Sequence, residues 1–271
     1  MIMKLTSSKF LQIWMWVLLV ISGCCVFWID KKVEDIEQID ATITENTKYG
    51  YPCKTVSICQ RKGYALGYSD KHKQPLWVSY GLTRSQVVTR VCTRSDKFRP
   101  DPYFTNSPSL LDYKNSGYDR GHLAPAADMH WDPEVMHDSF YLSNMSPQVP
   151  GFNRGIWKQL EEWVRRTASN EVSVFVITGP IFYTNRIHKA IGKINKITVP
   201  DAYYKIIYDE TPPVKMIGFI LNNQPSTNSL DTFTCTVDDI EKVTGLDFFS
   251  LLNEDKEQKL ESTVNTNDWS W

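Results

Sequence analysis

The sequence reads Tyr118-Asp119-Arg120-Gly121-His122-Leu123-Ala124-Pro125 at the point that decides both its fold and its chemistry. Asn153 and Glu161 follow downstream, eight residues apart, at the start of a predicted helix. His122 supplies a base, Asn153 a neutral oxygen ligand and Glu161 an acid. Together these groups suit cleavage of a phosphodiester bond, in which a base activates water and a cation neutralises the developing charge.

His122 is the candidate general base. We expect Gly121 to allow a tight turn and a close approach to another element, and Asp119 or a nearby carbonyl to fix the histidine tautomer. An ordinary imidazole has a pKa of about 6.5, so at neutral pH it can take a proton from water that attacks phosphorus. A hydrogen-bonded structural histidine is the alternative.

The second half of the site is predicted on a helix over residues 154–168. One stripe of side chains recurs at a spacing of four residues, the spacing of one helix face: Asn153, Trp157, Glu161 and Arg165. Asn153 then lies at the helix N-terminus, where its carboxamide oxygen suits Mg²⁺, an ion that takes few protein ligands. The alternative is that Asn153 only caps the helix.

A zinc site is the competing interpretation of the histidines. His122, His130 and His137 are separated by eight and seven residues, which matches no standard zinc ligand set.

Basic residues gather near the motif although the whole chain carries a net charge of −1. They form two groups: Arg84, Arg90, Arg94, Lys97 and Arg99, and then Arg154, Lys158, Arg165 and Arg166. Arginine forks suit phosphate oxygens. For Arg84, Lys158 and Arg166 we favour a solvated face. No motif for reading bases stands out, so nucleic acid would be bound through its backbone.

The 271 residues divide into five predicted parts. Residues 1–9 are a cytosolic N-terminus, and the apolar residues 10–29 are either a transmembrane anchor or a lipoprotein signal with its lipid at Cys24. Residues 30–50 are a spacer, residues 51–253 a catalytic domain and residues 254–271 a loose tail. Both readings of residues 10–29 anchor the domain to a membrane and place it in a non-cytosolic compartment, the periplasm or the cell surface if the source is bacterial.

Four cysteines follow the apolar segment. Their even number is consistent with disulfides in an oxidising compartment. Cys53 and Cys59 are close enough to form a local bridge, which would leave Cys92 and Cys235 as a long-range pair, and the pairing stays open. A metal site is the weaker interpretation, because the cysteines do not have the spacing of zinc ligands. Buried free thiols are the remaining alternative.

The pattern of apolar residues predicts an α+β domain with an antiparallel sheet. Residues 64–68 with 76–80, and residues 202–208 with 214–221, indicate two hairpins, and residues 172–178 a buried strand that stops at Gly179-Pro180. Helices are expected at 134–139, 154–168 and 237–253.

Several segments together closely resemble the DNA/RNA non-specific endonucleases, particularly their endonuclease G-like branch. The likeness covers roughly residues 60–250. Besides Asn153 and Glu161, it rests on the segments 119–125 (DRGHLAP), 140–148 (FYLSNMSPQ), 178–180 (TGP), 199–200 (VP), 203–205 (YYK) and 244–248 (TGLDF).

The resemblance implies a ββα-metal nuclease fold, with a central antiparallel sheet flanked by helices, and one divalent ion, usually Mg²⁺ with Mn²⁺ as the alternative. His122 matches the family's general base and Asn153 its direct metal ligand. Glu161 matches the acid that holds metal-bound water.

The remaining site residues also come from the resemblance. Arg94 matches the phosphate-contacting arginine, with Arg99 in reserve, and Asn144 and Arg165 match supporting positions. The family cleaves DNA and RNA with little sequence preference and leaves 5′-phosphates. DNA, RNA and the membrane are therefore the expected partners, and a homodimer is left open.

Two other functions compete with a nuclease. One is a surface nucleic-acid-binding protein with an inactive site, and the other is a zinc phosphohydrolase that acts on small esters.

Overall fold

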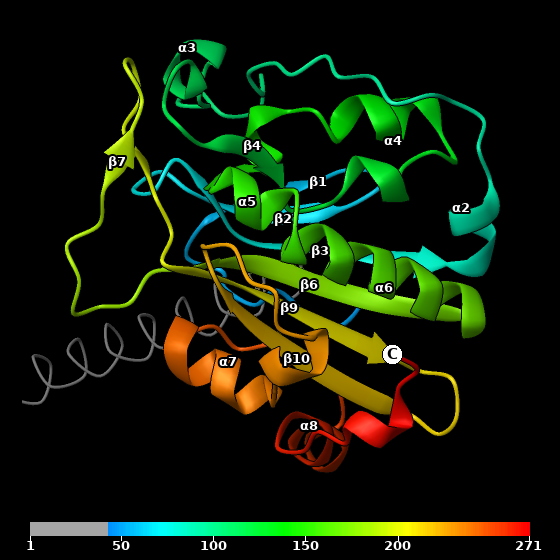
Figure 1. Ribbon diagram of the computed structural model, residues 1–271. Helices are drawn as coiled ribbons and strands as arrows, with labels where there is room; N and C mark the ends of the chain where they lie inside the picture. The colour runs from blue at the N-terminus through cyan, green and yellow to red at the C-terminus, as the bar shows by residue number, and fades with distance from the viewer. Residues whose placement is uncertain (1–42) are drawn as a thin grey trace, which may run out of the picture. The chain divides into compact units, whose positions relative to one another are not determined.

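The centre of the fold is an antiparallel sheet. In residues 43–271, the part of the chain that the computed structural model describes, seven strands pair in the order β1-β2-β3-β6-β9-β10-β11 (Figure 1). Their bounds are β1 Ser57–Gln60, β2 Ala65–Ser69, β3 Gln74–Thr83, β6 Ser173–Ile181, β9 Ala202–Asp209, β10 Lys215–Asn222 and β11 Thr234–Cys235.

Helices flank this sheet. They are α2 Arg84–Val88, α3 Leu110–Tyr113, α4 Pro133–Asp138, α5 Pro150–Asn153, α6 Ile156–Asn170, α7 Val237–Thr244 and α8 Glu254–Glu261. Short 3₁₀ turns lie at Ala126–Asp128, Leu142–Asn144, Leu230–Phe233 and Thr266–Asp268. This arrangement confirms the predicted α+β fold of an antiparallel sheet flanked by helices.

Both faces of the sheet are covered by other elements. Successive residues of a strand point to opposite faces, so neighbouring residues show what covers each face. In β9, Tyr203 packs against Phe152 and Trp157 of the α5–α6 segment, with ring centroids 5.4 and 5.5 Å away. The next residue, Tyr204, packs against Phe248, which follows α7. All eight residues of β9 are therefore buried, and the strand reads as a nearly continuous apolar run.

A long excursion between β3 and β6 carries the sequence motif. It holds a two-stranded ribbon of β4 (Asp119–His122) and β5 (Met145–Gln148), with His122 opposite Met145. The motif is therefore a strand and not the turn that the sequence predicted. The predicted close approach at Gly121 is confirmed, since a Cβ there would meet Gln148 Oε1 at 2.0 Å. A second small ribbon pairs β7 (Ala190–Ile191) with β8 (Ile197–Thr198).

The two predicted hairpins are confirmed as β2–β3 and β9–β10. The buried strand does not stop at Gly179-Pro180. Pairing of β6 with β3 ends at Thr178, but pairing with β9 continues to Ile181, so a proline without an N–H is tolerated there.

The predicted helices differ from those in the structure mainly in where they begin and end. Asn153 closes the separate short helix α5, and α6 begins only at Ile156, after Gly155 takes a non-helical conformation. The helix predicted to reach residue 253 stops at Thr244, because Gly245 adopts the left-handed conformation (φ 68°) that ends helices.

The segment predicted to be a loose tail is ordered in part. Residues 254–261 form α8, and Trp269 is buried against Trp163 of α6, with ring centroids 5.6 Å apart. Trp163 also donates a hydrogen bond to the carbonyl of Ser270. Large apolar side chains near the end of the chain therefore complete the core.

The domain also starts earlier than predicted. Asn46 donates a hydrogen bond to the carbonyl of Arg61 and accepts one from Ser79 through its own carbonyl, so residues 44–50 belong to the domain rather than to a spacer. The predicted segments 1–9 and 10–29 lie outside the described residues. Within residues 43–271, no helix is long and apolar enough to cross a membrane.

The predicted disulfides are wrong for the described part of the chain. Cys53, Cys59, Cys92 and Cys235 are all free thiols there. Cys92 instead lies beside the carbonyls of Met129 and His130.

Gly121→Ala is expected to destabilise the fold by about 1–3 kcal/mol, because the added methyl group would collide with the fully buried Gln148. Urea unfolding measures this difference. Gly81→Ala in β3 is the matched control, since a Cβ there meets nothing within 4 Å. Equal stability of the two variants would contradict the prediction.

Candidate active site

One pocket gathers most of the predicted site residues. Its volume is about 380 Å³, and its lining comes from β4, the turn after β4, the end of α5, α6 and the loop that carries Arg94. Figure 1 shows β4, α5 and α6 close together. Its lining residues are Arg94, Arg120, His122, Pro125, Ala126, Ala127, Asn153, Arg154, Lys158, Glu161 and Arg165.

His122 lies at the buried side of this pocket. Its ring packs between Phe98 and Phe140, with centroids 5.6 and 5.0 Å away. Its Nε2 atom has no hydrogen-bond partner. Burial, together with the nearby charges of Arg94 and Arg120, lowers the pKa of His122 to about 3. The imidazole is therefore neutral at physiological pH and has one nitrogen without a partner.

Asn153 is held by Asp119, the first residue of β4. Its Nδ2 donates to Asp119 Oδ2 at 2.9 Å, and Arg154 donates to both oxygens of the same carboxylate. Burial acts to raise the pKa of Asp119, but the hydrogen bonds from Arg154 and Asn153 bring it below its ordinary value. Asp119 therefore orients Asn153 and not, as the sequence suggested, His122. With its nitrogen engaged, Asn153 has its carboxamide oxygen left as a ligand.

Glu161 is partly exposed in the pocket, and its carboxylate accepts no hydrogen bond within residues 43–271. Lys205 of β9 lies behind it, fully buried, with its Nζ unbonded and 4.8 Å from the centre of the Trp157 ring. Burial raises the pKa of Glu161 and lowers that of Lys205, while each charge partly offsets the effect on the other.

Arg165 forms the inner wall of the pocket. Its guanidinium donates to Asp128 Oδ1 at 2.8 Å, and the other oxygen of Asp128 accepts from the hydroxyl of Tyr80 at 3.0 Å. Because this ion pair is buried and hydrogen-bonded, it fixes α6 against the turn after β4.

The two candidate phosphate-binding arginines separate clearly. Arg94 lines the pocket, where its guanidinium is 5.0 Å from the centre of the Phe140 ring and pairs with Asp96. Arg99 does not line it and instead donates to the carbonyls of Lys97 and His137.

Asn144 does not line the pocket. Its side chain is fully buried and forms a pair of hydrogen bonds, each 2.9 Å long, with the backbone of Ala124. It also donates to the carbonyl of Ser139. Asn144 thus fixes the chain just after His122 and has no direct access to a ligand.

Three basic residues at the site were not predicted from the sequence. Arg120 and Lys158 line the pocket, although Lys158 was assigned to a solvated face. Lys205 was quoted only within a strand, and a lysine among Tyr203, Tyr204 and two isoleucines was the available signal of a buried charge.

The alternative zinc site is not formed. The Nδ1 atom of His130 contacts the carbonyl of Cys92, and that of His137 contacts Arg99 and Asp138. Within residues 43–271, the single cluster of three potential metal ligands contains no histidine.

The donors in the pocket fit a hard divalent cation. Such ions prefer oxygen ligands. The pocket offers the carboxamide oxygen of Asn153, whose nitrogen is bonded to Asp119, and the carboxylate of Glu161. The absence of cysteine from the lining argues against a soft metal.

A basic pocket with a neutral histidine and oxygen ligands, set on an α+β scaffold, is typical of a hydrolase that acts on phosphodiesters. Residues 43–255 match the family model for the DNA/RNA non-specific endonucleases. The chain belongs to this family, and to its endonuclease G-like branch. It is therefore a nuclease that acts on nucleic acids, in a family of divalent-metal-dependent enzymes.

Curated relatives agree with this assignment. The chain is 32% identical over 240 residues to the mitochondrial nuclease of Saccharomyces cerevisiae, covering 80% of this chain and 73% of that protein. It is 32% identical over 218 residues to human mitochondrial endonuclease G, covering 75% and 73%.

A solved structure described as the EndoG/EndoGI complex is similar as well. Its TM-score is 0.73 at 31% sequence identity, and the match covers 78% of this chain and 94% of that one.

These relatives correct the predicted location. The sequence predicted a membrane-anchored domain in the periplasm or at the cell surface, whereas the relatives above are named as mitochondrial nucleases. That prediction is therefore wrong.

Asp119→Ala is expected to reduce nuclease activity about 10- to 100-fold, because Asn153 would lose the partner that orients it. Plasmid cleavage at several Mg²⁺ concentrations measures the effect. Glu162→Ala is the control, since Glu162 lies on α6 outside the pocket and only pairs with Lys158. An Asp119→Ala enzyme as active as this control would show that Asp119 does not orient the site.

Proposed function

We propose that the protein is a sugar-non-specific endonuclease that hydrolyses DNA and RNA to 5′-phosphate ends, with His122 as general base and one Mg²⁺ ion, or Mn²⁺ in its place. One observation carries this proposal: His122, Asn153 and Glu161 come from three different elements into one pocket lined by four further basic side chains and Arg165.

His122 has the protonation state that a base needs. The imidazole is neutral, and its unpartnered Nε2 can take the proton of a water molecule as the oxygen attacks phosphorus. A bound phosphodiester adds negative charge beside Arg94 and Arg120. This charge raises the pKa of His122 and makes it a stronger base when substrate is present.

Arginines position the phosphate. Arg94 and Arg120 lie over the rings of Phe140 and Phe98, at 5.0 and 4.0 Å from the ring centres, and both line the pocket. Such donors bind the non-bridging oxygens of any phosphodiester. Binding through phosphate oxygens needs no contact with base or sugar, so it suits both DNA and RNA.

Asn153 and Glu161 would hold the divalent ion, Asn153 directly and Glu161 through water. When bound, the ion would neutralise negative charge on the phosphate and on the leaving oxygen. Arg165 and Asn144 would act as supports, Arg165 by fixing α6 and Asn144 by fixing the chain after His122.

His122→Ala is expected to lower the rate of plasmid nicking at least about 100-fold, because a general base contributes roughly 10²- to 10⁴-fold to the rate. The full-length wild type and variant are compared with Mg²⁺ and with EDTA. His72→Ala is the control, since His72 contacts Thr198 and Phe182 and does not line the pocket.

Three outcomes would contradict the proposal. Equal activity of wild type and His122→Ala would show that His122 is not the general base. Salt-sensitive DNA binding without cleavage in any divalent metal would indicate an inactive binding protein. Zinc-dependent turnover of a small phosphodiester, without plasmid cleavage, would indicate the phosphohydrolase.

Asn153→Ala is expected to raise the Mg²⁺ concentration needed for half-maximal activity about 10-fold or more, because the variant lacks the direct ligand. A titration of cleavage rate against Mg²⁺ measures this shift. An unchanged midpoint, with only a lower maximal rate, would show that Asn153 acts on the substrate and does not hold the metal.

A further inference from the structure

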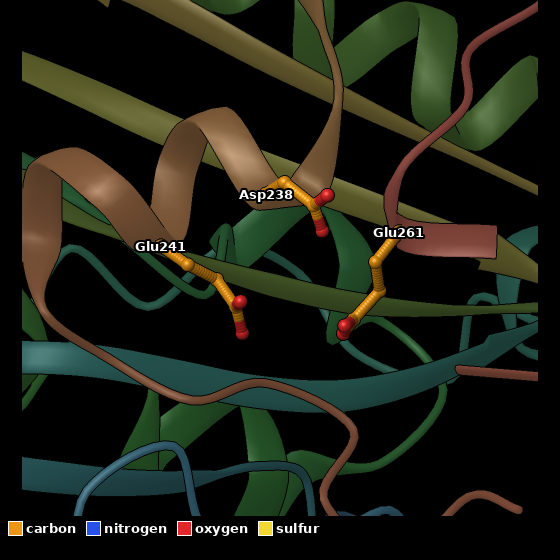
Figure 2. Close-up of side chains that lie close together, drawn as sticks. All are labelled: Asp238, Glu241 and Glu261. Atoms are coloured by element: carbon orange, nitrogen blue, oxygen red, sulfur yellow. The ribbon is translucent and has the colours of Figure 1, made fainter. Parts of the chain in front are cut away.

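A second group of acidic side chains lies apart from the catalytic pocket. Asp238 and Glu241 are on α7, and Glu261 is the last residue of α8 (Figure 2). One carboxylate oxygen from each lies within 4.8 Å of the others. None of the three lines the catalytic pocket, and α7 packs on the sheet face opposite to α6, where Ile240 approaches Gly218 of β10.

Glu261 distinguishes this group from an ordinary acidic surface. Only 6% of its surface is exposed, and its Oε1 atom is buried without a hydrogen-bond partner. Figure 2 shows its carboxylate directed toward those of Glu241 and Asp238. An unpaired carboxylate in such a place is unfavourable, so a compensating group is required.

Within residues 43–271, Glu261 forms no salt bridge with a basic side chain. The charged groups that act most strongly on Glu261 are all acids: Glu241, Glu257, Asp238 and Asp247. Burial and these neighbours raise the pKa of Glu261 to about 9. The site therefore attracts either a proton or a metal ion.

The other two carboxylates are arranged to serve as ligands. Glu241 accepts a hydrogen bond of 2.7 Å from the backbone N–H of Phe248 through Oε1, which orients the carboxylate and leaves its second oxygen available. Asp238 lies three residues earlier, on the same face of α7, and is exposed. A cation can therefore enter from the solvent side and keep water ligands there.

We propose that Asp238, Glu241 and Glu261 bind one hard divalent cation, for which Ca²⁺ is the best fit. Three oxygens at about 2.4 Å from one Ca²⁺ ion can each be about 4.2 Å from the others, so side chains whose oxygens already lie within 4.8 Å of one another need only small movements. Mg²⁺ requires bonds of about 2.1 Å and near-octahedral geometry, which would demand a tighter arrangement.

The role of this cation is structural. It joins the first turn of α7 to the end of α8, and the chain that follows α8 packs on α6 through Trp269 and the hydrogen bond from Trp163 to Ser270. The ion would thus hold the C-terminal segment against the helix that carries Glu161.

The test uses thermal unfolding of the full-length chain in the Asn153→Ala background, which weakens metal binding at the catalytic pocket. Protein stripped with EDTA and dialysed at neutral pH is heated with no metal, with CaCl₂ or with MgCl₂. Asn153→Ala is combined with each of three further substitutions, Glu261→Gln, Asp238→Asn and Glu254→Gln. Glu254→Gln is the matched control, because it removes an exposed charge from α8, the helix that carries Glu261. Equilibrium dialysis with metal analysis gives the stoichiometry.

Saturating Ca²⁺ is expected to raise the melting temperature of Asn153→Ala by about 5 °C, with one calcium bound per chain. The Glu254→Gln control should retain this shift, whereas Glu261→Gln and Asp238→Asn should lose most of it. Because Asp238 is exposed, its variant tests the site even if Glu261→Gln folds poorly.

Three results would overturn the proposal. The absence of any Ca²⁺ shift in Asn153→Ala would mean that the buried carboxyl group holds a proton. A shift that survives in Glu261→Gln and Asp238→Asn would place the ion elsewhere. A larger shift with Mg²⁺ than with Ca²⁺ would reject Ca²⁺ as the preferred ion.

Discussion

The packing of Trp157 onto the sheet is the interaction on which the active site depends. Its fully buried ring contacts Phe152 of α5 and Tyr203 of β9, and the last two rings also stack on each other. Phe152 immediately precedes Asn153, and Trp157 lies one turn before Glu161. One aromatic cluster therefore positions both proposed metal ligands, although they belong to two helices separated by a break at Gly155. Polar contacts then complete the arrangement, because Asp119 holds the end of α5 and Asp128 holds α6 through Arg165.

The charges below the pocket are balanced, and the charges around it are not. Glu161, which is partly exposed, and the buried Asp128 are opposed by Lys205 and Arg165, so this side of the pocket holds as many acids as bases. Buried charges are tolerated when they are matched in this way. The lining adds Arg94, Arg120, Arg154 and Lys158, with no further acid. A chain with a net charge of −1 thus presents a locally positive site to a polyanion.

Sequence patterns predicted the strands of the sheet well, since they follow local signals, and the resemblance to a known family indicated most of the residues that the pocket brings together. Alternating apolar residues marked the two hairpins, and the segment around His122 was specific enough to indicate its partners. The break between Asn153 and α6 escaped prediction, because a four-residue spacing fits one continuous helix equally well. The role of Asp119 depends on a contact with a residue 34 positions away, and that of Lys205 on its burial. The contact of Asp119 cannot be read from neighbouring residues, whereas the apolar residues on both sides of Lys205 were a signal of its burial. The disulfide prediction failed because an even number of cysteines says nothing about the distances between them.

The excursion that carries β4, β5, α5 and α6 leaves and rejoins the sheet at adjacent points. Thr83 at the end of β3 is paired with Ser173 at the start of β6, and the N–H of Arg84 donates to the carbonyl of Val172. The sheet therefore fixes where this long segment begins and ends but not how many residues it contains. Because the entropy of closing a loop grows only slowly with its length, residues can be added to or removed from the outer turns without changing the strand register. The fold thus separates a scaffold of constant geometry from a catalytic insertion whose size is free to vary.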